Sequence, residues 1–134
     1  MMEIYEMREG RPVRTDSFHD DVWINLVAPT AEEIEEVLSF LKLDREAITS
    51  ALDDEEGSRT EVSQDYTLIL VDVPTREWRN SREEFTTYPL SITVTDRAIV
   101  TVCLQEVFAL ANIAAGKSKS KSVFDVTNLS LIHI

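Results

Sequence analysis

The sequence predicts an α/β fold in which helices cover a β-sheet, and three observations support this prediction. The run VWINLV at residues 22–27 is apolar on both faces, which is typical of a strand inside a covered sheet. A helix start signal follows that strand within a few residues. From Arg59 onward, the apolar residues change from helical spacing to the continuous and alternating patterns of strands.

The chain begins with a predicted hairpin. Two short alternating runs, EIYEM at residues 3–7 and PVRT at residues 12–15, are separated by REGR, whose glycine favours a tight reversal. The third strand is the run at residues 22–27. Its apolar character on both faces predicts a central place in the sheet.

Two helices are predicted next. Thr30 and Glu33 form a capping box, in which the hydroxyl and the carboxylate bind free backbone amides at the helix start. Asp44 is expected to cap a second, short helix, with Leu43 and Ile48 as a hydrophobic staple. The stripe of the first helix that packs on the sheet consists of Ile34, Val37, Leu38 and Leu41. The residues expected to face away from it are Glu32, Glu35, Glu36 and Ser39.

Three further strands are predicted at residues 66–73, 89–95 and 98–104. The last two form a hairpin with Asp96 and Arg97 at its turn. Between strands, the polar residues 75–87 predict a solvated excursion, and Trp78 and Phe85 are expected to pin it to the domain. The residues expected to share one core are Trp23, Ile34, Leu38 and Leu70.

The end of the chain predicts two helices, around residues 105–115 and 122–130. The stretch GKSKSKS between them is a low-complexity linker. The ending NLSLIHI continues no pattern, and two origins are open for it: it belongs to the natural protein, or it is foreign to it. We therefore divide the chain into an α/β domain at residues 1–116 and a linker and tail at residues 117–134.

Composition excludes several function classes. The chain of 134 residues fits one domain, and 25 acidic against 13 basic residues give a net charge of -12, which repels nucleic acid. A single cysteine, Cys103, forms no intrachain disulfide and indicates a reducing compartment. The N-terminus does not read as a secretory signal, and no apolar run reaches the roughly 20 residues that a membrane span needs. We expect this chain to be soluble.

Catalysis is not expected from these residues. His19 and His133 are the only histidines, and neither forms a triad with a nucleophile. Cys103 lies in an apolar strand, where a buried thiol behaves as a small hydrophobe. The stretch ANIAAGKS resembles the end of a phosphate-binding loop, but Ala111 replaces its first glycine and a helix precedes it. We therefore interpret it as part of the linker and expect no enzyme.

One acidic run is suited to a metal ion. Asp53, Asp54, Glu55 and Glu56 follow the second predicted helix, and Mg²⁺ keeps several waters, so a weak site needs only one or two carboxylates. The alternative is a solvated face that keeps the protein soluble.

Four segments, in this order, resemble the N-terminal cytosolic domain of the CorA family of magnesium and related divalent-cation transporters. They are VWINL before a helix, LDREAITSALDDEEGSRTE, DYTLILVDVP and PLSITVTDRAIVTVC, and the resemblance runs from Asp21 to Leu104. It implies an α/β/α sandwich with a mixed parallel and antiparallel sheet. It also implies a pentamer around a pore, with a stalk helix and two membrane helices carrying Gly-Met-Asn further along the chain.

The resemblance also suggests a regulatory Mg²⁺ site. In some members a carboxylate pair in the second helix binds Mg²⁺ at a subunit interface, and the positions that match it here are Thr49 and Ser50. Asp53 and Asp54, one turn later, are the candidate substitutes. The function implied is a cytosolic regulatory domain of a transporter, on the cytoplasmic side of the cell membrane. The alternative is a free-standing α/β binding module with no transport role.

Overall fold

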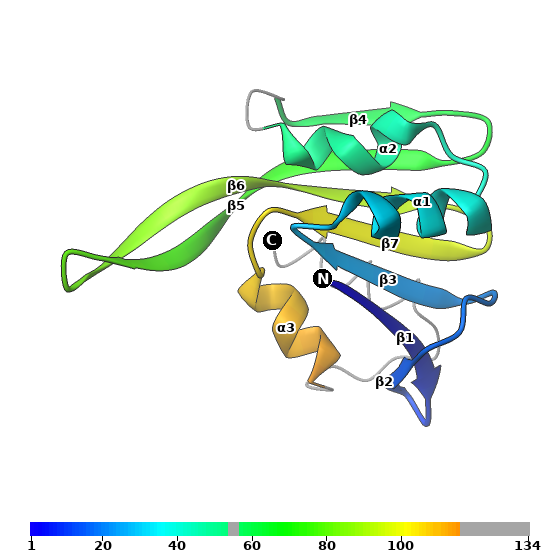
Figure 1. Ribbon diagram of the computed structural model, residues 1–134, viewed down its shortest axis with the longest axis horizontal. Helices are drawn as coiled ribbons and strands as arrows, with labels where there is room; N and C mark the ends of the chain where they lie inside the picture. The colour runs from blue at the N-terminus through cyan, green and yellow to red at the C-terminus, as the bar shows by residue number, and fades with distance from the viewer. Residues whose placement is uncertain (54–56, 116–134) are drawn as a thin grey trace.

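The structure is a computed structural model that describes residues 1–53 and 57–115. Its centre is a seven-stranded sheet with the strand order β2-β1-β3-β7-β6-β5-β4 (Figure 1). The strands are β1 (Met2–Arg8), β2 (Arg11–Thr15), β3 (Val22–Val27), β4 (Arg59–Val62), β5 (Thr67–Arg79), β6 (Arg82–Val94) and β7 (Ala98–Cys103). Within this sheet β3 and β7 run parallel, whereas every other neighbouring pair is antiparallel. The expected mixed sheet is confirmed.

Helices cover both faces of the sheet. They are α1 (Ala31–Phe40), α2 (Arg45–Thr49), the short 3₁₀ helix η1 (Ser50–Leu52) and α3 (Phe108–Ala114). Strand β7 shows the two faces, because side chains alternate along a strand. Val100 and Val102 join the core under α1 and α2, while Ile99 and Cys103 join the core under α3. The three layers of an α/β/α sandwich are therefore present.

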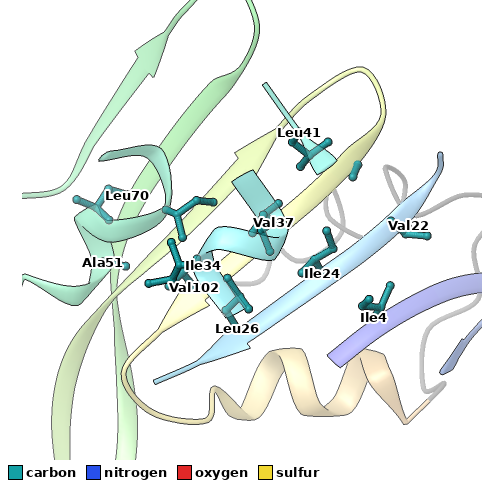
Figure 2. Packing of buried hydrophobic residues seen from close by; sticks show 13 residues of the cluster. Ile4, Val22, Ile24, Leu26, Ile34, Val37, Leu41, Ala51, Leu70 and Val102 are labelled. Atoms are coloured by element: carbon teal, nitrogen blue, oxygen red, sulfur yellow. The ribbon is translucent and has the colours of Figure 1, made fainter. Parts of the chain in front are cut away.

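The first core lies between the sheet and the helices α1 and α2. Figure 2 shows Ile34 and Val37 of α1 above Ile24 and Leu26 of β3. Val37 and Ile48 are fully buried, and Leu38 is partly buried against the same core. A buried hydrogen bond of 3.1 Å, from the hydroxyl of Thr93 to the carbonyl of Ala47, fixes α2 on β6. The helical stripe expected from the sequence is thus the packing face of α1.

The second core lies on the opposite face, and it contains Trp23. The expectation that Trp23 shares one core with Ile34, Leu38 and Leu70 is wrong, because neighbouring residues of a strand point to opposite faces. Its indole ring stacks on Tyr5 with 4.9 Å between the ring centroids. The sequence pattern shows that β3 is buried on both faces but does not say which core each residue joins.

The predicted helix starts are confirmed. Thr30 caps α1: its hydroxyl accepts from the backbone N–H of Glu33, and the Glu33 carboxylate accepts from the backbone N–H of Thr30. Asp44 precedes α2, but its side chain makes no capping hydrogen bond. Its carboxylate instead accepts a 3.1 Å hydrogen bond from the hydroxyl of Tyr66, so that part of the expectation is wrong.

Residues 75–87 are not a solvated excursion. They continue β5 and β6 as paired strands, and these reverse at Asn80 and Ser81, which both have positive φ angles of 52° and 63°. The resulting hairpin projects beyond the helices (Figure 1). Trp78 and Phe85 do not pin it to the domain, because their side chains are exposed. The polar composition reflects a ribbon whose two faces both meet solvent near its tip.

The remaining predictions concern the two ends of the chain. The first hairpin is confirmed as β1 and β2, with Glu9 and Gly10 at positive φ in its turn. The helix expected around residues 105–115 is confirmed as α3. The helix expected at residues 122–130, the linker and the tail lie outside the described residues.

Candidate functional site

The candidate metal site lies at the end of the second helical segment, where η1 leads toward β4. Asp53 is the residue that ends η1, and its backbone N–H donates to the carbonyl of Ser50 at 3.3 Å. The residue is exposed, as a hydrated cation requires. Its predicted partner Asp54 lies outside the described residues. The structure therefore places one member of the predicted pair and leaves the other as a prediction.

Thr49 and Ser50, the positions where the resemblance suggested a carboxylate pair, use their hydroxyls within the helix. The hydroxyl of Thr49 donates to the carbonyl of Arg45 at 3.2 Å, and that of Ser50 donates to the carbonyl of Glu46 at 2.5 Å. Both bonds run back one turn within the same helical segment. Ser50 is also buried. Neither side chain provides a charged, accessible ligand.

Strands β4 and β5, which follow Asp53 in the sequence, carry further acidic residues. The hydroxyl of Ser58 lies 3.5 Å from Oδ2 of Asp72, and Nε of Arg59 lies 2.6 Å from Oε1 of Glu61. In the described ranges 1–53 and 57–115, no three His, Cys, Asp or Glu residues gather as a group that could hold a metal ion. The described donors thus fall short of a closed metal site.

A hollow lies at the other end of the strands and was not predicted from the sequence. Its volume is about 560 Å³, and it is lined by the segments 41–42, 63–67 and 94–97. Arg97 stands in its wall with three contacts. Its Nε donates to Asp20 at 2.8 Å, its Nη1 donates to the carbonyl of Phe40 at 2.8 Å, and its Cζ lies 4.3 Å from the centre of the Phe40 ring.

The chemistry of this hollow does not select a ligand. Lys42 and Arg97 are balanced by Asp65 and Asp96, so the wall attracts neither anions nor cations strongly. Arg97 is engaged in holding the β6–β7 turn against α1. Among the described side chains, the one buried polar atom without a hydrogen-bond partner is Oγ of Ser91, which lies on β6 and does not line the hollow. We therefore assign no site there.

Two of the groups considered for catalysis, Cys103 and His19, lie in the described residues. Cys103 is buried in β7, and burial raises the pKa of its thiol, which keeps it protonated and unreactive. His19 lies before β3, where its Nε2 is 3.2 Å from the carboxylate of Glu6. The expectation that Cys103 is structural agrees with this burial.

None of the helices in the described residues is both long enough and apolar enough to cross a bilayer.

A family comparison matches most of the chain. The family described as "CorA-like Mg2+ transporter protein" matches residues 19–127. A comparison with curated proteins finds no match.

Solved structures share the fold. The soluble domain of CorA from Methanocaldococcus jannaschii has a TM-score of 0.66 and 22% sequence identity, over 84% of this chain and 44% of that one. The ZntB cytoplasmic domain from Vibrio parahaemolyticus has a TM-score of 0.65 and 13% identity, over 97% of this chain and 55% of that one. The full-length CmaX protein has a TM-score of 0.70 and 15% identity, over 98% and 43%. The present chain thus spans only about half the length of these proteins, and at such identities the likeness establishes the fold alone.

Proposed function

This chain belongs to the family of CorA-like Mg²⁺ transporter proteins, and from that premise we propose that it is the cytosolic regulatory domain of a divalent-cation transporter. The observation that carries the proposal is the family match over residues 19–127 on a chain with the fold of the CorA soluble domain. The family is one of transporters and not of enzymes. The acidic surface fits a role beside cations, because a net charge of -12 attracts them.

We assign ion conduction to segments outside this domain. In the full-length protein, a stalk helix and membrane helices would follow this domain, and the domain would sit on the cytoplasmic side of the cell membrane. The chain covers only 43% of the full-length CmaX protein, which supports further segments in a full-length relative. Homo-oligomerisation into a pentamer would then be a property of the full-length protein.

Regulation would act through weak Mg²⁺ binding at Asp53 and Asp54. The exposed position of Asp53 supports this assignment, while the buried Ser50 argues against the neighbouring helical position. Mg²⁺ is held by oxygen ligands and retains water, so two carboxylates at a helix end suit a weak site. A second subunit would complete the shell in the oligomer.

The decisive experiment for the transporter assignment is to sequence the native gene beyond residue 122. Two hydrophobic spans with a Gly-Met-Asn motif are expected. A stop codon directly after the domain, with no such spans, would favour the free-standing binding module instead.

The metal assignment is tested by thermal unfolding in MgCl₂. Ligand at about ten times its Kd should stabilise the native state by roughly 1.4 kcal/mol. The double variant Asp53→Asn, Asp54→Asn should lose that increment and keep its fold. Sodium chloride at matched ionic strength is the control, because screening of the net charge also stabilises the domain. An equal response of parent and double variant would show that these aspartates are only a solvated face.

A further inference from the structure

The sheet has two edge strands, β2 and β4, which lie at its opposite borders (Figure 1). An edge strand presents backbone N–H and C=O groups that can pair with a strand of another chain. In an antiparallel pair, residues that exchange hydrogen bonds with the partner strand alternate with residues whose backbone groups point away from it. The register therefore shows which residues of each edge strand are open to a further strand.

Strand β2 is protected against such pairing. Its hairpin with β1 has a two-residue turn, which is closed by the pair Arg8 and Arg11. The alternation then turns the backbone groups of Pro12 and Arg14 outward, and proline has no N–H to donate. The strand also contains two arginines and no acidic residue, so it offers no pair of opposite charges to a second copy of itself.

Strand β4 is open to pairing. The backbone N–H of Ser63 donates to the carbonyl of Tyr66 at 2.8 Å, and these residues are opposed when the register of β4 with β5 is continued toward the turn. The alternation from this pair turns Thr60 and Val62 outward, and each has a backbone N–H. Both residues are exposed, Val62 to 81%. The sheet can therefore be extended at β4.

The charges of β4 fit a second β4 that runs antiparallel to it. When Thr60 of one copy is opposite Thr60 of the other, Arg59 of each copy is directly opposite Glu61 of the other. Opposite charges at such positions stabilise an antiparallel pair. Nε of Arg59 lies 2.6 Å from the carboxylate of Glu61 in its own strand, and a guanidinium has several N–H donors, so contacts with both carboxylates are compatible.

Two other symmetric registers keep the outward backbone groups opposed, and both are less favourable. With Thr60 opposite Val62 of the second copy, Glu61 is opposite Glu61 and the carboxylates repel. With Val62 opposite Val62, Glu61 is opposite Ser63 and gains no ion pair. A parallel pair in the same register would set like charges side by side. The charge pattern therefore selects one register, and the partner that it fits is another copy of this strand.

We propose that two copies of this chain associate through their β4 strands, which pair antiparallel about a two-fold axis at Thr60. The two sheets then become one continuous sheet. The N–H of Thr60 in each copy donates to the carbonyl of Thr60 in the other. The same surface of both copies is used, so the contact closes as a dimer. This contact goes beyond the proposed function and does not depend on it.

The shortness of β4 limits the strength of this dimer. Its four residues bury far less than the roughly 1,200 Å² of a standard interface, so we expect a Kd of about 0.1 to 1 mM. The net charge of -12 opposes the approach of two copies. At a salt concentration of about 0.15 M the Debye length is about 8 Å, so this long-range repulsion is largely screened while directly opposed side chains still interact.

Sedimentation equilibrium of the whole chain at about 0.05 to 2 mM, in about 0.15 M salt, tests the proposal. The average mass of the parent should rise with concentration toward that of a dimer. Arg59→Glu and Glu61→Arg should each weaken association at least about tenfold, because each sets like charges opposite each other. The matched controls Arg82→Glu and Glu84→Arg change the net charge equally at exposed positions of β6, and they should associate as the parent does.

A mixture of the two β4 charge variants tests the register. The acidic residues of the Arg59→Glu chain then face the arginines of the Glu61→Arg chain, so the mixture should form a heterodimer although each variant alone stays monomeric. Thr60→Pro tests the backbone contact, because it removes an N–H that points away from β5. It should abolish the dimer and keep the circular dichroism spectrum of the monomer.

Three outcomes would overturn the proposal. The first is a parent chain that stays monomeric up to about 2 mM. The second is association that persists in Thr60→Pro, which would place the contact elsewhere, for example at the exposed Trp78 and Phe85. The third is a mixture of the two charge variants that stays monomeric while the parent associates. None of these bears on the transporter assignment, which is decided by the downstream gene sequence.

Discussion

Nε1 of Trp23 donates a buried hydrogen bond of 2.8 Å to Oγ1 of Thr101, across the parallel pair β3 and β7. The threonine hydroxyl in turn donates a hydrogen bond of 2.9 Å to Oδ1 of Asn25. The bonds join residues that are 78 and 76 positions apart in the chain. An indole N–H needs a partner when it is buried, and here the opposite strand supplies it.

Removing this acceptor should destabilise the domain. In Thr101→Val the shape is kept, but the indole N–H and the Asn25 carbonyl lose their partner inside the sheet. The expected loss in unfolding free energy is about 1 to 3 kcal/mol, measured by urea denaturation. Thr60→Val, at an exposed position of β4, should stay within about 0.5 kcal/mol of the parent. Equal losses in both variants would mean that the effect comes from the valine and not from the hydrogen bond.

Two truncations under the helices should differ in cost. Ile48→Ala removes a fully buried side chain and should cost about 2 to 5 kcal/mol. Leu38→Ala should cost less, because Leu38 is only partly buried and the cavity it leaves opens to solvent. Both values come from chemical denaturation. If Leu38→Ala costs more than Ile48→Ala, then α1 packs more deeply than the structure indicates.

All three tyrosines should titrate late in the native protein. Each phenol donates to a carboxylate: Tyr5 to Glu3, Tyr66 to Asp44 and Tyr88 to Glu77. Burial together with the Glu3 carboxylate raises the pKa of Tyr5 to about 12, and the pKa values of Tyr66 and Tyr88 are raised as well. Ultraviolet absorbance of the phenolate should therefore develop above the ordinary midpoint near pH 10, with the native fold checked by circular dichroism. Tyr5→Phe should remove the step of this titration that occurs at the highest pH.

The same shifts link stability to alkaline pH. A phenol whose folded pKa lies above its unfolded value stabilises the fold fully below about pH 10, and this contribution is lost as pH rises through the folded value. For Tyr5 the window runs from about pH 10 to about 12. A native-state titration with all three midpoints near pH 10 would contradict the three hydrogen bonds.

Glu33 should contribute an acid-sensitive part of the stability. Burial opposes its ionisation, but the backbone N–H of Thr30 and the N-terminal ammonium, 3.0 Å away, outweigh burial and lower its pKa. A lowered folded pKa gives stability that is present above the unfolded value of about 4.3 and is lost as pH falls. Parent and Glu33→Gln should therefore differ in unfolding free energy at neutral pH, and the difference should shrink below about pH 4. A difference that does not vary with pH would refute this role.

Residues 76–85 form an arm at the end of the β5–β6 hairpin, and replacing Ser81 at its tip with glycine should stabilise the turn. Ser81 has a φ of 63°, which glycine adopts without the steric cost that other residues meet, and Asn-Gly is the preferred pair in such turns. Ser81→Gly should slow amide hydrogen exchange in the arm by a few-fold, while global stability changes by less than about 0.5 kcal/mol. Ser63→Gly, outside the arm, is the control and should leave the exchange of the arm unchanged.

Helix-capping residues and apolar runs, which can be recognised in the sequence, made much of the fold predictable. Thr30 and Glu33 mark the start of α1, and the apolar runs mark β3 and β7 because burial on both faces leaves few polar positions. The arm was not predictable in the same way. Its strands pair because they continue the register set in the buried part of β5 and β6. The residues of the arm have no buried face, so their sequence does not alternate between apolar and polar side chains as a half-buried strand does.

The candidate site was predictable only in part. The acidic run is visible as composition, and the structure confirms that Asp53 is exposed at a helix end. Thr49 and Ser50 donate hydrogen bonds from their hydroxyls to helix carbonyls. The residue pattern alone does not show these bonds. The side of the sheet on which Trp23 lies likewise depends on the register of β3 with β7.

The parallel pairing of β3 with β7 has a consequence for how the chain folds. The sheet consists of two locally connected groups, β1 to β3 and β4 to β7, and this one pairing joins them. Each group assembles by antiparallel pairing of strands that lie near each other in the sequence. The parallel seam between β3 and β7 instead closes a loop of about 70 residues, which costs entropy before any contact offsets it. The seam should therefore form late, and until it does the edges of β3 and β7 stay open to other chains. Aggregation during refolding should accordingly begin at these two strands, at the centre of the finished sheet and away from its native edges.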